Sequence, residues 1–260
     1  MNIVTKRISQ SFYAGTNLLG RKKDDIFLIS YPKSGNTWVK FLLINVLINN
    51  KELKEDLSFK LVDETIPELG RDNLMKPWKF KSLPRFIKSH LAYKKVFFGN
   101  NKALLLVRNP KDVMVSYYHY VQSNYGRNFQ GDFSEFIRSK KFGIETRILH
   151  QISWQTKATA TIKFEDLKKD NASTLDTALK KLGVNIDEKT FIKSYEDASF
   201  NKMKELEKGP KRYNEHKPDY KFVRKGTSNQ WRDYFNQNDL DYYNSLLEKY
   251  KGLYLNYYES

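Results

Sequence analysis

The chain has 260 residues, 40% hydrophobic and 15% aromatic, which is enough for one α/β domain with a large core. It has no cysteine, which excludes disulfides, thiolate metal sites and cysteine nucleophiles, and its four histidines are too scattered to predict a metal centre. The net charge of +16 favours an anionic partner, such as a nucleotide, an acidic glycan or a membrane surface, although a lysine-rich solubilising surface explains it equally well. Nucleic acid is not favoured, because the sequence shows no RNP, KH or zinc-finger pattern.

Targeting and membrane segments are not expected. Residues 1–20 lack a basic region followed by a long apolar one, so they do not resemble a signal peptide. The longest apolar helical stretch, Val39–Ile48, is interrupted by Lys40 and Asn45 and is far shorter than the roughly 20 residues that a membrane span needs. With no repeat, low-complexity tract or linker, we expect a single domain over residues 1–260, located in the cytoplasm.

Strand and helix patterns alternate along the chain. Short apolar or β-branched runs predict four strands, at Asp25–Ser30, Arg85–Lys88, Leu104–Val107 and Ala158–Lys163. Helical patterns cover Thr37–Asn49, Lys111–Gln122, Phe133–Lys140 (with a capping box from Asp132 to Glu135), Asp166–Leu182, and a last helix from a cap at Asn238 through Leu247. This alternation predicts an α/β fold with a central parallel sheet flanked by helices, whose ligands bind at the carboxyl ends of the strands.

The first expected strand leads into Tyr-Pro-Lys-Ser-Gly-Asn-Thr-Trp, residues 31–38. Gly35 lets the backbone approach an anion, Lys33 adds a positive charge, and the helix that follows offers unpaired N–H groups. The order differs from the Walker A pattern G-x-x-x-x-G-K-[ST], so the segment predicts a P-loop-like phosphate site but not an ordinary ATP or GTP loop. Taken alone, a plain strand–turn–helix connection with an exposed lysine is also possible.

Two further basic segments carry the same chemistry. Arg108 follows the third expected strand, Pro110 opens the next helix, and Ser116 lies one to two turns inside it, so arginine and serine together could hold a second phosphate. Lys33 and Arg108 both come directly after strands and should share one edge of the sheet. The third segment, residues 222–231, is Phe-Val-Arg-Lys-Gly-Thr-Ser-Asn-Gln-Trp, in which two adjacent cations precede glycine and hydroxyl residues. Alone, these two segments are equally typical of a helix cap and a solvated loop.

Together the three segments resemble the cytosolic-type sulfotransferase family, whose members transfer a sulfuryl group from 3′-phosphoadenosine 5′-phosphosulfate (PAPS) to a hydroxyl and release adenosine 3′,5′-bisphosphate (PAP). The resemblance covers about residues 26–235 and is that of a short, bacterial-like member. Lys-Ser-His-Leu at 88–91 and Ser199-Phe200 with Met203 are minor matches. The resemblance implies the PAPS sulfotransferase fold and a reaction that requires no metal.

The resemblance also implies a role for each motif residue. The 5′-phosphosulfate loop would comprise Lys33 at the sulfate-bridging oxygen, Ser34, Gly35, Asn36 and Thr37 at the 5′-phosphate, and Trp38 stacked on adenine. The 3′-phosphate would be held by Arg108, Ser116, Arg224, Lys225 and Gly226, and the adenine site lined by Ser199 and Phe200. The catalytic set would be His90 as the base, with Lys33, Lys88 and Ser116 around the transferring group.

Elementary chemistry agrees with a histidine base. An alcohol or phenol is a poor nucleophile at neutral pH, and a histidine can take its proton during in-line attack. His90 closes a strand-like run and should lie at the same edge as Lys33. Two other readings stay open: a phosphotransferase of the P-loop type, for which we find neither the Walker lysine nor a convincing magnesium carboxylate, and a catalytically silent anion- or nucleotide-binding protein.

The chain departs from the family pattern at a few positions. Phe164 stands where the family often has tyrosine, and Asn229-Gln230-Trp231 replaces Gly-Asp-Trp. No animal-type dimerisation motif is visible after Phe235, so no dimer of that kind is expected. The acceptor, a small-molecule or glycan hydroxyl, should be held by segments outside the motifs: residues 63–84, 120–142 and 205–220. Residues 208–221, basic and rich in Pro and Tyr, predict either a lid over the site or disorder.

Overall fold

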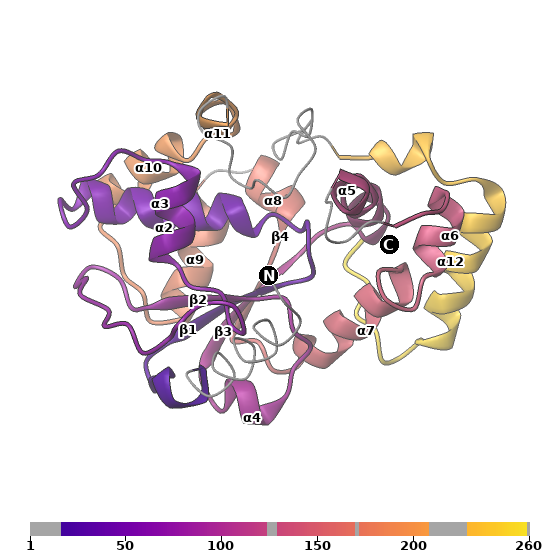
Figure 1. Cartoon of the computed structure of the whole chain (residues 1–260), viewed down its shortest axis with the longest axis horizontal. Helices are drawn as coiled ribbons and strands as arrows, with labels where there is room; N and C mark the ends of the chain where they lie inside the picture. The colour runs from indigo at the N-terminus through magenta and orange to yellow at the C-terminus, as the bar shows by residue number, and fades with distance from the viewer. Residues whose placement is uncertain (1–16, 124–128, 170–171, 208–227, 259–260) are drawn as a thin grey trace, which may run out of the picture.

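The structure, a computed structural model, describes residues 17–123, 129–169, 172–207 and 228–258. Its centre is a sheet of four parallel strands in the order β2-β1-β3-β4 (Figure 1). The strands are β1 (Ile26–Ser30), β2 (Phe86–Ser89), β3 (Lys102–Val107) and β4 (Ala160–Lys163). Helices lie on both sides of this sheet, so the predicted α/β class with a central parallel sheet is confirmed.

The two faces of the sheet bury separate apolar clusters. Along β3, Leu104 and Leu106 point to one cluster, whereas Leu105 and Val107 point to the other, as the period of two in a strand requires. The first face is covered by α2 (Asn36–Asn49), α3 (Phe59–Thr65), α9 (Ser173–Lys181) and α10 (Glu188–Asp197). On the second face lie α4 (Lys95–Phe98) and the end of α7 (Ile144–Gln155). Burial on both faces explains why the strands have nearly continuous apolar sequences.

A third apolar cluster lies beside the sheet and consists mainly of helices (Figure 1). It joins α7 to α5 (Pro110–Ser123), α6 (Phe133–Arg138) and α12 (Gln237–Lys249). The remaining elements are α8 (Phe164–Lys169), α11 (Phe200–Leu206) and the short 3-10 helix η1 (Gln230–Asp233). No described helix is long and apolar enough to cross a membrane.

The last helix and the helix expected over residues 166–182 differ from the prediction. The capping box of Asp132 and Glu135 is confirmed, but the last helix is capped by Asn236 rather than Asn238, because Asp239 three residues on returns the hydrogen bond to the Asn236 backbone. The helix expected over Asp166–Leu182 is divided into α8 and α9. Between Leu167 and Leu175 the only apolar residue is an alanine, so no continuous apolar stripe holds one helix to the core.

Candidate active site

The loop between β1 and α2 turns through two left-handed residues. Lys33 has φ 69°, and Gly35, the N-cap of α2, has φ 106°. Lysine adopts this conformation only at a cost, whereas glycine adopts it freely. Because the cap residue is a glycine, no side chain caps the start of α2, where the Trp38 N–H donates to the Gly35 carbonyl at 3.0 Å. The positive end of the helix dipole points at this loop and favours an anion. The predicted phosphate loop therefore has the backbone geometry of an anion site.

The ring of Phe164 lies against both predicted phosphate segments. A Cβ added at Gly35 would lie 2.5 Å from Phe164 Cδ2, and Arg108 Cζ lies 4.6 Å from the centre of the same ring. The Arg108 guanidinium also donates a hydrogen bond of 3.2 Å to the Lys33 carbonyl. Lys33 and Arg108 therefore share one edge of the sheet, and the aromatic ring at 164 packs between their loops although it carries no hydroxyl.

The backbone around Arg108 is fixed by residues that the sequence did not single out. Buried Arg147, on α7, donates to the Arg108 carbonyl (2.8 Å) and to the hydroxyl of Tyr254 (2.6 Å). Glu165 Oε1 accepts from the backbone N–H of Asn109 at 3.0 Å. No local sequence pattern predicts these contacts, because they join residues that are 39 to 107 positions apart in the chain.

The start of α5 is tied to the end of the third predicted segment. Both oxygens of the buried Asp112 carboxylate accept backbone hydrogen bonds, from Asn229 N–H at 2.8 Å and Trp231 N–H at 3.2 Å. Ser116 lies half-buried on the same helix. Arg224, Lys225 and Gly226 lie outside the described residues, as do residues 208–221 of the expected lid. The Asp112 contacts show that the end of the third segment is fastened beside α5.

On the side expected to face adenine, aromatic rings cluster around Trp38. Its ring centre lies 6.1 Å from that of Phe164 and 5.9 Å from that of Tyr195. Phe200, the first residue of α11, packs against the same apolar cluster, and Ser199 is the N-cap of that helix. Within the described chain, the buried Trp38 Nε1 and both amide atoms of Asn36 have no hydrogen-bond partner. Buried polar atoms normally have a hydrogen-bond partner, so atoms that lack one here are consistent with a polar ligand at this loop.

The predicted base and its neighbour lie at the end of β2. His90 Nδ1 is 2.7 Å from the Ser30 carbonyl oxygen. Because a carbonyl only accepts, Nδ1 carries the proton in the neutral ring, and Nε2 is the atom that can accept one. Lys88 Nζ binds Glu68 Oε2 at 3.0 Å, and Lys33 Nζ lies 5.0 Å from the centre of the Tyr120 ring. The structure thus brings Lys33, Lys88 and His90 to neighbouring strand ends, together with a carboxylate that the sequence analysis missed.

Many aromatic side chains of the segments expected to hold the acceptor are part of the core. Trp78 and Phe80 contact each other with ring centres 4.8 Å apart and pack against the cluster under α2. Phe133 and Phe136 are buried in the cluster around α5, and Phe129 packs against it. Core packing, rather than ligand binding, therefore explains most of the aromatic content of these segments.

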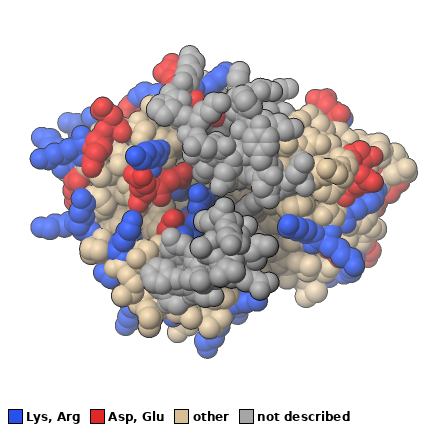
Figure 2. Space-filling view, viewed as in Figure 1, with Lys and Arg blue, Asp and Glu red and all other residues tan. Residues whose placement is uncertain are grey.

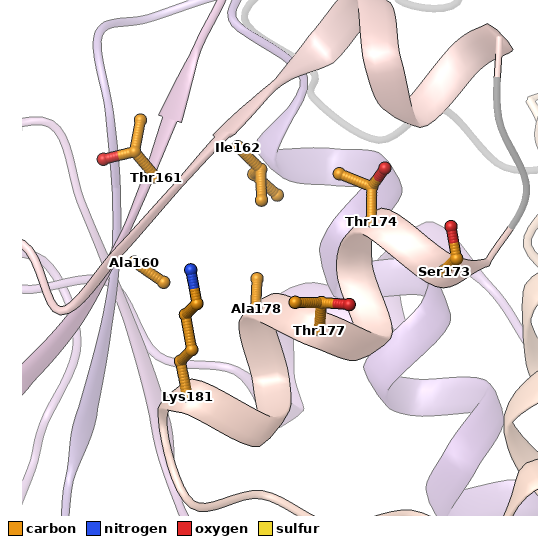
Figure 3. A pocket seen from close by; sticks show the side chains of 8 residues that line it. All are labelled: Ala160, Thr161, Ile162, Ser173, Thr174, Thr177, Ala178 and Lys181. Carbon is orange, nitrogen blue, oxygen red and sulfur yellow. The ribbon is translucent and has the colours of Figure 1, made fainter.

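A hollow of about 330 Å³ between β4 and α9 lies apart from these residues (Figure 3). Its walls carry hydroxyl and methyl groups and one lysine, from Ala160, Thr161, Ile162, Ser173, Thr174, Thr177, Ala178 and Lys181. None of the predicted site residues lines it. Among the described residues, no group of three His, Asp or Glu side chains is placed to hold a metal ion. Figure 2 shows both charge signs interspersed on the described part of one face.

A family model of the sulfotransferase domain matches residues 23–253. Sulfotransferase 1C2 of Rattus norvegicus is 27% identical over 259 residues, which cover 89% of this chain and 84% of that protein. Sulfotransferase 4A1 of Mus musculus is 29% identical over 182 residues, which cover 64% of this chain and 62% of that protein. The chain thus spans less than two thirds of the length of this second relative.

Solved structures show the same fold. Mouse sulfotransferase SULT7A1 in complex with PAP superposes with a TM-score of 0.67 at 23% identity, covering 93% of this chain and 91% of that one. Retinol dehydratase in complex with retinol and PAP superposes with a TM-score of 0.72 at 19% identity, covering 97% and 88%. These likenesses support the fold, and the family model decides the family because it spans nearly the whole chain. The chain belongs to the sulfotransferase family.

Proposed function

We propose that this protein is a PAPS-dependent sulfotransferase that transfers a sulfuryl group to the hydroxyl of a small molecule. The observation that carries the proposal is the meeting of three features at one edge of the sheet: the left-handed loop at Lys33 and Gly35, the guanidinium of Arg108, and the ring of His90 held by the Ser30 carbonyl. The similar structures of SULT7A1 and retinol dehydratase both hold PAP, which supports the same cofactor here.

The residues present fit the cofactor. The first N–H groups of α2 suit a 5′-phosphate, and the amide of Asn36 and the indole N–H of Trp38 are buried polar groups with no hydrogen-bond partner in the described chain. Ser34 and Thr37 supply hydroxyls in the same loop. Trp38 and Phe200 offer apolar surface for a base. Arg108 and Ser116 lie on the elements that would hold a 3′-phosphate, and we assign Arg224, Lys225 and Gly226 to the same phosphate on the sequence alone.

When bound, PAPS supplies an activated sulfuryl group. The protein's part is then to orient the acceptor, take its proton and stabilise the charge left on the donor phosphate. His90 accepts the proton at Nε2, because Nδ1 donates to Ser30. The Lys33 ammonium, held by the turn before α2, stabilises the developing negative charge. Lys88 contributes a second cation at the end of β2.

The acceptor class follows from the reaction and from the surface beside the base. A hydroxyl needs a base, and an alcohol or phenol is the simplest acceptor that His90 could deprotonate. Leu91, directly after the base, exposes 43% of its surface, which suits an apolar acceptor more than a glycan. Retinol dehydratase holds retinol, an apolar alcohol, in the similar structure. The expected cytoplasmic location stays a prediction.

The test is transfer of radiolabelled sulfate from PAPS to three acceptor groups: phenols, apolar alcohols and neutral oligosaccharides. We expect labelled product with a phenol or an apolar alcohol, without added metal. The His90→Ala variant should lose transfer but keep its affinity for PAP. A protein that binds PAP and transfers sulfate to no acceptor would be a binding module, and one that instead transfers phosphate from ATP–magnesium would be a P-loop phosphotransferase. Either result would contradict the proposal.

A further inference from the structure

Glu68 is held beside β2 by the backbone. The Lys88 N–H donates to the Pro67 carbonyl at 2.8 Å, and the Leu69 N–H donates to the Lys88 carbonyl at 2.8 Å, so residues 67–69 run parallel to the strand. The Glu68 N–H in turn donates to Asp72 Oδ2 at 2.7 Å. The placement of Glu68 is therefore determined by main-chain pairing next to Lys88, and the carboxylate does not depend on a flexible loop for its position.

The Glu68 carboxylate forms an ion pair with Lys88 and interacts electrostatically with His90, the two groups assigned to catalysis. Its side chain exposes 23% of its surface, that of Lys88 exposes 15%, and Lys88 Nζ lies 3.0 Å from Oε2. Burial alone would raise the pKa of Glu68, but the positive charges of Lys88 and His90, with that of Arg71, outweigh it and lower the pKa to about 2. Glu68 is thus ionised at any pH at which the protein works.

Two further described groups interact with His90 or with Glu68, and neither is negative. His150, on α7, also faces His90, and burial, the charge on His90 and that of Arg147 lower its pKa to about 3, so it stays neutral. Arg71 Nη1 lies 3.8 Å from Glu68 Oε2, and the Arg71 side chain exposes 61% of its surface. Lys88 and Lys33 are both cations. A proton taken up by His90 would therefore add to a cluster of positive charges in which Glu68 carries a negative one.

We propose that Glu68 is a positioning residue for the proton transfer: its carboxylate holds the Lys88 ammonium at the end of β2 and compensates the charge that His90 gains from the acceptor. The inference rests on the proposed function, in which His90 is the base. The proton moves from the acceptor oxygen to His90 Nε2, and Glu68 stays ionised throughout. Glu68 is not itself the base, because an ion-paired carboxylate with so low a pKa accepts a proton poorly.

A direct test is an NMR titration of the histidine rings with PAP bound at saturation. The chain has only four histidines, and loss of one signal in His90→Ala assigns the ring of interest. In Glu68→Gln, which keeps the shape but removes the charge, we expect the titration midpoint of His90 to move to lower pH by at least about half a unit. The matched control is Glu64→Gln, which removes a carboxylate on α3 that exposes 65% of its surface. Superimposable His90 titrations in Glu68→Gln and the wild type would overturn the proposal.

The kinetic test uses PAPS and 1-naphthol as the probe acceptor. In Glu68→Gln the acid limb of kcat/KM should move to lower pH and kcat should fall at least about fivefold, while PAP affinity stays within about twofold. Glu68→Asp should recover part of kcat, since it restores the charge. If His90→Ala loses transfer but Glu68→Gln matches the wild type, only the role of Glu68 fails. If His90→Ala keeps transfer, the base assignment fails and the role of Glu68 fails with it. If Glu68→Gln loses transfer while His90→Ala keeps it, the Glu68 carboxylate is the base, and the positioning role is overturned.

Discussion

The loop after β1 and the cluster after β2 bring cations to the same edge of the sheet by different means. Lys33 is positioned by adjacent residues of the chain: the turn has positive φ at Lys33 and Gly35 and leads directly into α2. Lys88 is held by Glu68, 20 residues earlier in the chain, through an ion pair and a strand-like backbone contact. The proposed phosphate side thus depends on one short segment, whereas the proposed proton-transfer side is assembled from segments that are distant in the sequence. Substitutions should therefore affect cofactor binding and chemistry separately.

The substitution His90→Ala should separate the effect on chemistry from the effect on cofactor binding most clearly. Removing a general base typically lowers the rate by about 10² to 10⁴-fold, so kcat should fall by this factor while calorimetric PAP affinity stays within about threefold. The matched control is His119→Ala, which removes a histidine on α5 whose ring contacts Tyr234 at 2.7 Å and has no assigned role in transfer. Transfer that survives in His90→Ala would show that the cluster after β2 is not the site of proton transfer.

Gly35→Ala should damage the phosphate side alone. The new Cβ would meet the Phe164 ring at 2.5 Å, and alanine at φ 106° is strained, which costs about 1–3 kcal/mol. We expect at least tenfold weaker PAP binding, measured by calorimetry, together with a lower melting temperature. Gly252→Ala is the control, because Gly252 also has positive φ (75°) but its added Cβ would contact nothing within 4 Å. Equal PAP affinities in the two variants would contradict the assignment of Gly35 to the phosphate loop.

The buried side chain of His150 tests how the stability of the folded chain depends on pH. Burial, followed by the charges of His90 and Arg147, lowers the pKa of His150 to about 3, whereas an unfolded histidine titrates near 6.5. Between these values the unfolded chain binds a proton that the folded chain does not, so the free energy of unfolding decreases as the pH falls. His150 should contribute about 2 kcal/mol to this decrease between pH 7 and pH 5.

The measurement is urea unfolding of the wild type and His150→Phe at both pH values. The variant should lose most of that pH dependence, because phenylalanine fills a similar space beside Tyr31 without titrating. An unchanged dependence in the variant would show that other groups cause it and that His150 is not held neutral in the folded chain.

The smallest expected effect is that of Asp112→Asn. The amide has a single acceptor oxygen for the two N–H groups of Asn229 and Trp231, so it should loosen the end of the third segment. Loss of one such hydrogen bond costs about 1 kcal/mol, and we expect PAP binding to weaken about fivefold with ADP binding unchanged. Asp132→Asn, in the capping box of α6, is the control. If ADP affinity falls equally, the segment does not serve the 3′-phosphate.

The strands and the phosphate loop were predictable because each is encoded locally. Short apolar or β-branched runs predicted all four strands, and Lys33, Ser34, Gly35 and Thr37 in close succession predicted the loop. The helices α3, α4, α7, α10 and α11 were not predicted, because tertiary packing rather than a strong local period selects them. The last cap was placed two residues too late, because both Asn236 and Asn238 are good cap residues and only the partner Asp239 decides between them.

The proton-transfer side was predicted only in part. Lys88 and His90 belong to one contiguous motif match, whereas Glu68 lies outside it. The proximity of Glu68 to Lys88 becomes visible only in the folded chain, where residues 67–69 pair with β2. The same holds for Arg147, whose two hydrogen bonds join Arg108 to Tyr254. Sequence spacing carries no information on contacts of this kind, since the folded backbone alone brings the segments together.

The central claim, that this edge of the sheet binds a nucleotide with a 3′-phosphate, is tested most directly by calorimetric titration with PAP, ADP and ATP–magnesium. The account predicts tight PAP binding without metal and at least tenfold weaker binding of ADP, because Arg108 and Ser116 would contact a phosphate that ADP lacks. A preference for ATP–magnesium, or no binding of any of the three nucleotides, would contradict it.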